Sequence, residues 1–242
     1  MAGANPVRVL VTGFGPFPGV PHNASETLVR LLAMQAAFRT AEIELSTAVL
    51  PVSWATAHDA AKSAVATFAP DAVLHFGVSR RATVFEIESR AVNISGPRPD
   101  AHGHTLPPMP LVRAGAPHLT PTLAPLHLIR ALRRANVPAE LSRNAGRYLC
   151  NALYYRSLAR EGDGGPLAAF IHMPVLGDPS LHPRITITEA VDAARILVQA
   201  AAEAVLRAKR QTARHGRSRH GNGSQTFHRD GWSGRAVWRE RG

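Results

Sequence analysis

Two kinds of hydrophobic pattern alternate along the chain. Short runs of apolar, often β-branched residues are typical of buried strands, and apolar residues spaced three or four apart are typical of helices packed on a sheet. The strand-like segments are 7–13, 42–50, 72–76, 83–94, 139–142 and 167–172, and the helix-like segments are 26–32, 54–68, 126–134, 148–158 and 186–205. This order predicts the α/β fold class, as a single-domain three-layer α/β/α sandwich around a mostly parallel sheet.

Local signals mark where these elements begin and where the pattern fails. Asn23 or Ser25 is placed to cap the first helix, and residues 186–189 form a capping-box pattern before the last one. Segment 83–94 fits either a pair of strands or one long bent strand. Eight prolines within residues 97–125 interrupt both kinds of pattern, which predicts an ordered surface loop or a lid.

Positive charge is concentrated at the C-terminal end. The 242 residues include 28 Lys and Arg against 17 Asp and Glu, a formal net charge of +11. From residue 207 onward ten basic residues face two acidic ones, so this end holds +8 and the rest of the chain only +3. Apolar periodicity also stops near residue 209. We therefore expect one domain over residues 1–209 and a disordered basic tail over residues 210–242.

The tail and the cysteine count bear on partners and location. Phe227, Trp232 and Trp238 are interleaved with arginines and could stack on bases, so the tail could bind nucleic acid. No apolar run approaches the roughly 20 residues of a membrane span, and no signal-peptide pattern opens the chain. With Cys150 as the one cysteine, no internal disulfide can form. These features predict a cytoplasmic protein that does not bind membranes.

Cys150 is a candidate nucleophile. It lies where the segment 144–151, which contains a glycine, passes into a helix. The positive end of a helix dipole favours the thiolate, which is the nucleophilic form of cysteine. The alternative is a small core residue, because free cysteines are among the most buried residue types. Position alone leaves both interpretations open.

A candidate base and two candidate acids lie on strands. His172 ends the strand 167–172, and the carboxyl ends of parallel strands open onto the ligand crevice. His172 could act as a general base or could be a hydrogen-bonded structural residue. Glu86 and Glu88 are two apart on a strand, so they share a face and either could orient the histidine. The other interpretation is an exposed face with solvated acids.

Two further motifs argue against common cofactors. Residues 13–19 lie where a dinucleotide fingerprint would follow the first strand, but a proline replaces the third required glycine. Phe14 and Phe17 in this loop suit an apolar pocket better than a phosphate. His102 and His104 form the only close histidine pair before the tail, without the ligand cluster that a metal needs. We predict no metal and no cofactor.

Several segments, taken together, resemble a known family over about residues 7 to 206. They are Thr12-Gly-Phe-Gly-Pro-Phe17, Asn23-Ala-Ser25, Leu50-Pro-Val52, Ala145-Gly-Arg-Tyr-Leu-Cys-Asn151 and Phe170-Ile-His-Met-Pro174. In the same order they are similar to Gly-Phe-x-Pro-Phe, Asn-Pro-Ser, Leu-Pro-Val, Ala-Gly-Thr-Tyr-Leu-Cys-Asn and Phe-Ile-His-Val-Pro of the type I pyroglutamyl peptidases, also called pyrrolidone-carboxylate peptidases. These cysteine enzymes remove an N-terminal pyroglutamyl residue from peptides.

The resemblance implies a catalytic role for three of the candidates. Cys150 would be the nucleophile, and His172 would act as base and acid. The family's catalytic glutamate lies five residues before the Asn of a strand end similar to Val92-Asn93-Ile94, which selects Glu88 over Glu86 to hold the imidazole.

The resemblance also implies a binding site and partners. Arg98 falls on an arginine that the family uses near the oxyanion, and Phe14, Phe17 and Tyr148 would line the pocket for the flat lactam ring. The implied substrate is a peptide or small amide, with no metal or cofactor. A homo-oligomer, often a tetramer in the family, is implied as well.

Two departures from the family pattern keep other hypotheses open. Gly77-Val-Ser-Arg-Arg-Ala82 stands where the family has Gly-Gln-Ala-Gly-Gly-Arg, and Ser95-Gly-Pro-Arg98 stands where it has Asp-Asp-Ala-Arg. Both changes would alter the wall of the substrate pocket. The same Cys-His-Glu set could therefore act on a different small amide or lactam. The non-enzymatic hypothesis is a peptidase-like domain with a nucleic-acid-binding tail.

Overall fold

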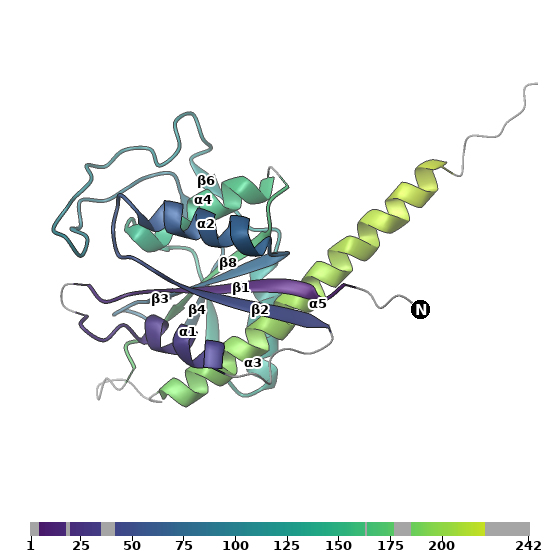
Figure 1. The fold of residues 1–242 in the computed structure, drawn as a ribbon, viewed down its shortest axis with the longest axis horizontal. Coiled ribbons are helices and arrows are strands. Elements are labelled where there is room, and N and C mark those ends of the chain that lie inside the picture. Colours follow the sequence, from purple (N-terminus) through teal and green to yellow (C-terminus); the bar gives the residue numbers. More distant parts are fainter. Residues whose placement is uncertain (1–4, 18–19, 35–41, 163, 177–184, 221–242) are drawn as a thin grey trace, which may run out of the picture. The chain divides into compact units, whose positions relative to one another are not determined.

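The computed structural model describes residues 5–17, 20–34, 42–162, 164–176 and 185–220. Within these residues the centre is a six-stranded sheet with the strand order β2-β1-β3-β8-β4-β7 (Figure 1). Its strands are β1 (Val7–Phe14), β2 (Ile43–Leu50), β3 (Ala72–Val78), β4 (Phe85–Glu88), β7 (Ala139–Ser142) and β8 (Leu167–Met173). Neighbouring strands are parallel except β8 and β4, which are antiparallel. The predicted mostly parallel sheet is confirmed.

Helices cover both faces of this sheet (Figure 1). α1 (Ala24–Met34), α3 (Pro125–Arg134) and residues 190–205 of α5 (Ile187–His220) share one apolar core with one face. α2 (Ala57–Phe68) and α4 (Leu149–Gly162) share a second core with the other face. The predicted three-layer sandwich is therefore confirmed. No helix in the described part of the chain is long and apolar enough to cross a membrane.

The predicted helix caps are present. Oδ1 of Asn23 accepts the backbone N–H of Ser25 at 3.1 Å, at the start of α1. At the start of α5, the N–H of Glu189 donates to Oγ1 of Thr186 at 3.2 Å, and the N–H of Thr186 donates to Oε2 of Glu189 at 2.7 Å. This reciprocal pair is the capping box that the sequence predicted, and it fixes where the last helix begins.

α5 extends further than its hydrophobic pattern predicted. The loss of periodicity placed the end of this helix near residue 209, but the helix continues to His220. The added residues include alanine, arginine and glutamine, which are good helix formers, and a helix can continue where packing has stopped. The compact unit of residues 1–207 ends within α5, and residues 208–242 form a second unit. The disorder predicted for residues 221–242 falls outside the described residues.

Segment 83–94 contains two strands, the first of the two predicted forms. β5 (Ala91–Val92) follows β4 and pairs with β6 (His118–Leu119) in a separate antiparallel two-stranded sheet. The proline-rich segment lies between β5 and β6 and is held by side-chain hydrogen bonds. Oδ1 of Asn93 accepts the N–H of Val112 at 2.9 Å, and Oγ of Ser95 donates to the carbonyl of Pro107 at 2.6 Å. This segment is an ordered loop.

Candidate active site

The two-residue period of the strands places the candidate side chains on one face of the sheet. In β8 the residues on either side of His172 belong to the core with α1, α3 and α5, so His172 points to the opposite face, that of α4. In β4, Phe85 and Ile87 belong to that same core, so Glu86 and Glu88 also point to the α4 face. Glu86 and His172 are paired across the two strands, which brings all three side chains to one point.

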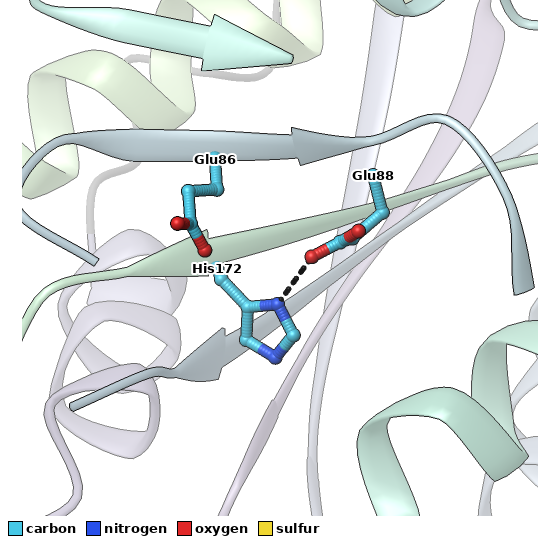
Figure 2. A group of neighbouring side chains, drawn as sticks. All are labelled: Glu86, Glu88 and His172. Carbon is cyan, nitrogen blue, oxygen red and sulfur yellow. Dashed lines mark hydrogen bonds and ion pairs between the residues drawn. The ribbon is translucent and has the colours of Figure 1, made fainter. Parts of the chain in front are cut away.

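Glu88 and His172 form a buried hydrogen-bonded pair (Figure 2). Nδ1 of His172 donates to Oε1 of Glu88 at 2.8 Å. The hydroxyl of Tyr154, in α4, donates to the backbone carbonyl of Glu88 at 2.9 Å and ties this strand to the helix. Because the carboxylate holds Nδ1–H, the ring is fixed in orientation and its Nε2 is left for proton transfer.

Cys150 is the second residue of α4. The backbone N–H groups of a first helical turn have no partner within the helix, and the helix dipole favours a thiolate there. A Cβ atom on Gly77 would lie 3.2 Å from Sγ of Cys150 and 2.9 Å from the ring of Phe170. Gly77 also pairs with His172 between β3 and β8. The lack of a side chain at Gly77 therefore lets the thiol lie beside the imidazole.

The protonation of His172 depends on both of its partners. Burial by itself lowers the pKa of His172, but hydrogen bonds to Cys150 and Glu88, with the negative charges of both groups, outweigh burial and raise this pKa to about 10. The ring is then protonated at neutral pH. The site thus places a protonated ring beside the Cys150 thiol, where the ring can give its proton to a leaving group.

Glu86 is a second carboxylate on this face, with different surroundings. Ligand atoms of Glu86, Glu88 and His172 all lie within 4.8 Å of one another, and Figure 2 shows both glutamates pointing from β4 toward the ring. Glu86 is only partly buried and lines the adjoining cavity. Burial raises the pKa of Glu86; the His172 ring opposes this shift and the charge of Glu88 adds to it. The sequence left either glutamate as the partner of His172, and the hydrogen bond is made by Glu88.

These three side chains could also be considered as metal ligands, since their oxygen and nitrogen atoms are close together. Nδ1 of His172 and Oε1 of Glu88 are already hydrogen-bonded to each other at 2.8 Å. The geometry therefore favours proton transfer over metal binding. The rings of His102 and His104 are 6.2 Å apart between centroids, and neither residue lines the cavity at Cys150.

Cys150 and His172 open into a cavity of about 670 Å³. The predicted binding residues also line it, namely Phe14, Phe17, Arg98 and Tyr148. The Arg98 guanidinium lies 5.0 Å from the ring centroid of Tyr148 and 5.4 Å from that of Phe17. Burial raises the pKa of Tyr148 to about 12, although Arg98 opposes this shift, so the phenol is neutral. Its hydroxyl donates to the carbonyl of Pro99 at 2.9 Å.

Two residues that position this wall were not singled out from the sequence. Nε1 of Trp54 donates to the backbone carbonyl of Arg98 at 3.1 Å, and the Trp54 ring packs edge-on against Tyr148 with centroids 5.4 Å apart. The buried carboxylate of Asp100 accepts the backbone N–H of Trp54 at 3.0 Å and two N–H groups of its own loop. The Pro-Asp dipeptide at this point is a turn signal that could have indicated Asp100. No motif indicates Trp54.

A thiol, a ring that can carry a proton and a buried carboxylate supply a nucleophile, an acid–base group and an orienting charge. Together with the α/β sandwich and the thiol at a helix N-terminus, they define the class of the protein as a cysteine-type hydrolase. Comparison with known proteins identifies the family within this class. The model of the pyroglutamyl peptidase family matches residues 7–207, so the chain belongs to the pyroglutamyl peptidase family, as the resemblance predicted.

Individual relatives and solved structures agree with this assignment. A pyrrolidone-carboxylate peptidase of Pyrococcus furiosus is 28% identical over 211 residues, which covers 83% of this chain and 100% of the relative. One of Clavibacter michiganensis is 32% identical, with coverage of 69% and 78%. The structure of a mutant pyrrolidone carboxyl peptidase from P. furiosus has a TM-score of 0.75 at 27% identity, covering 82% of this chain and 100% of that one. The pyrrolidone carboxyl peptidase of Fervidobacterium islandicum gives 0.74 at 29% identity, covering 79% and 96%.

Proposed function

We propose that this chain is a cysteine peptidase that hydrolyses the amide bond after an N-terminal pyroglutamyl residue, through a thioester acyl-enzyme. The observation that carries the proposal is the position of Cys150 beside the buried His172–Glu88 pair, in the wall of a cavity lined by aromatic side chains. Family membership supports the same activity. In this proposal Cys150 is the nucleophile and His172 carries the proton. Glu88 orients the His172 ring and balances its positive charge.

These positions support a reaction in two steps, acylation of Cys150 and hydrolysis of the thioester. Sγ of Cys150 forms a bond to the pyroglutamyl carbonyl carbon, Nε2 of His172 gives its proton to the leaving nitrogen, and the C–N bond breaks. Water then attacks the thioester while the neutral His172 takes a proton from it, the C–S bond breaks, and pyroglutamate leaves. The thiolate and imidazolium are restored. Glu88 keeps its hydrogen bond to Nδ1 of His172 and stabilises each imidazolium stage.

Two groups are available to stabilise the oxyanion that forms in each half. One is the backbone N–H of Cys150 in the first turn of α4, and the other is the guanidinium of Arg98. A donor of this kind contributes roughly 3 to 4 kcal/mol to transition-state stabilisation. We place the lactam ring against Phe14, Phe17 and Tyr148, where flat apolar faces replace water around a flat ring.

The direct test is hydrolysis of pyroglutamyl-7-amido-4-methylcoumarin by the wild type and by Cys150→Ser, with thermal unfolding to verify that the variant folds. We expect the variant to lose activity, and undiminished turnover would refute the proposal. The prolyl amide of the same dye lacks the lactam carbonyl and serves as a control substrate. Equal rates on the prolyl and pyroglutamyl amides would favour the alternative, a different small amide as substrate.

The proposal extends to the rest of the chain. Residues 1–209 would form the catalytic domain, so deletion of residues 211–242 should leave hydrolysis intact. If the tail binds nucleic acid, that affinity should vanish with the deletion and should fall steeply with salt. A catalytic thiol has to stay reduced, which favours the cytoplasm. The homo-oligomer implied by the family is tested by sedimentation of the full chain.

A further inference from the structure

The cavity at Cys150 contains more positive charge than hydrolysis of a neutral lactam uses. Arg81 and Arg147, here called the rim arginines, line it and are exposed to solvent. None of the ion pairs formed within the described residues involves either of them. The one carboxylate that lines the described wall is Glu86, which lies beside His172. As far as the described residues go, these two guanidiniums are thus available to a ligand.

Backbone contacts hold both rim arginines near the reacting groups. Oγ of Ser79 accepts the N–H of Arg81 at 3.3 Å, and the N–H of Ser79 donates to the carbonyl of Met173 at 2.9 Å. The turn with Arg81 is therefore fixed at the end of β8, next to His172. Arg147 is three residues before the thiol, and a Cβ atom on Gly96 would lie only 2.9 Å from its carbonyl oxygen. The backbone of each rim arginine therefore lies close to the catalytic residues.

The cavity also has room for more than the pyroglutamyl ring. Its volume of about 670 Å³ falls within the roughly 300–1,000 Å³ that accommodates a drug-sized ligand, whereas a five-membered lactam is much smaller. In the proposed function, Phe14, Phe17, Tyr148 and Arg98 bind the ring and its carbonyl. The remaining space, with the rim arginines in its wall, can receive the part of the substrate on the leaving side of the scissile bond.

We propose that the rim arginines select substrates in which the leaving peptide carries a carboxylate close to the scissile bond. This inference rests on the proposed function and names its substrate class. A guanidinium matches a carboxylate through two parallel hydrogen bonds. The carboxylate can be the side chain of an acidic residue directly after pyroglutamate or the C-terminus of a pyroglutamyl dipeptide. Because the rim arginines are exposed, the expected preference is about tenfold at low salt.

Four substrates measure this preference and separate the two sources of the carboxylate. They are pyroglutamyl-glutamate amide and its neutral counterpart pyroglutamyl-glutamine amide, and pyroglutamyl-alanine as the free acid and as the amide. We expect a kcat/KM about tenfold higher for the acidic member of at least one pair in low salt, and a smaller ratio in high salt because screening weakens exposed charges. The pair that shows the preference identifies the source.

Variants assign the preference to the rim arginines. Arg81→Gln and Arg147→Gln should each lower the acidic-to-neutral ratio, and the double variant should bring it close to one. Arg134→Gln removes an exposed arginine at the end of α3 and should keep the wild-type ratio. Equal kcat/KM values within both substrate pairs for the wild type would overturn the inference. An acidic-to-neutral ratio that stays at the wild-type value in both single variants and in the double variant would also overturn it. Failure to hydrolyse any of the four substrates would instead refute the proposed function.

Discussion

Replacing Glu88 by glutamine removes the negative charge behind the His172 ring and keeps a group of the same shape. Oε1 of Glu88 accepts Nδ1–H of His172 at 2.8 Å, and both side chains are buried. The amide oxygen of glutamine can still accept this hydrogen bond, so the ring keeps its orientation. The imidazolium loses the negative charge that balances it, however, so the ring holds its proton less tightly. The variant therefore isolates the effect of charge from that of position.

The size of the effect follows from Coulomb's law. With the two charge centres about 4 Å apart and an effective dielectric constant of about 20, the interaction is about 4 kcal/mol. If all of it is lost from the transition state and none from the resting enzyme, where the ring is also protonated, kcat/KM falls roughly a thousandfold, which is the upper limit of the effect. Glu86→Gln is the matched control, because Glu86 lies on the same strand and the same face but is only partly buried. A screened charge of this kind contributes at most about 1 kcal/mol, or roughly fivefold.

The assay is kcat/KM for the pyroglutamyl coumarin amide from pH 6 to 10.5, with circular dichroism and thermal unfolding for each variant. Because hydrogen bonds and charge raise the pKa of His172 to about 10, wild-type activity should fall as the pH rises through that value. In Glu88→Gln the loss should begin at lower pH, since the imidazolium is less stable. A loss of less than tenfold in Glu88→Gln, or a larger loss in Glu86→Gln, would refute this assignment of the two carboxylates.

Two further predictions concern Gly77 and His75. Gly77→Ala places a Cβ atom 2.9 Å from Phe170 and 3.2 Å from Sγ of Cys150, so we expect it to lower kcat/KM and to cost about 1 to 3 kcal/mol of stability. Gly15→Ala, where a Cβ atom would have only the Leu50 carbonyl at 3.7 Å, should change neither. Burial lowers the pKa of His75 to about 3, and hydroxyls of Thr12 and Ser157 engage its ring nitrogens. Between pH 6.5 and 5 the unfolded state alone takes up this proton, so unfolding free energy should drop by about 2 kcal/mol as the pH falls. His75→Gln should flatten the decline seen by chemical denaturation, and an unchanged slope would contradict the assignment to His75.

The elements that could be predicted from the sequence are those that fill the two cores. β1, β3 and β8 are nearly continuous apolar runs because helices cover both faces of the sheet. The direction of β4 could not be predicted. It has four residues, and its place between β8 and β7, antiparallel to one and parallel to the other, depends on pairing with segments far away in the chain. Hydrophobic period specifies a face and not a partner.

The same limit applies to the two glutamates. The period of two correctly put Glu86 and Glu88 on one face, but it cannot say which of them reaches His172. Glu86 is directly opposite His172 in the register, yet the hydrogen bond is made by Glu88, the diagonal neighbour two residues further along. Diagonal neighbours on antiparallel strands are within reach of long side chains. The resemblance selected Glu88 because the family motif fixes how many residues separate the catalytic glutamate from Asn93. The period of a strand gives only the face on which a side chain lies.

Some contacts at the site could not be predicted from the sequence, and they have one feature in common. In each of them the hydrogen-bond acceptor is a main-chain carbonyl. Trp54 holds the carbonyl of Arg98, Tyr148 holds that of Pro99, and Tyr154 holds that of Glu88. Every residue has such a carbonyl, so the identity of the acceptor residue leaves no trace in the sequence. A motif can locate a thiol or an imidazole, because the chemistry requires that side chain. It cannot locate the bonds that set the position of the thiol, ring and guanidinium relative to one another, and catalysis depends on positions of this kind to within a fraction of an ångström.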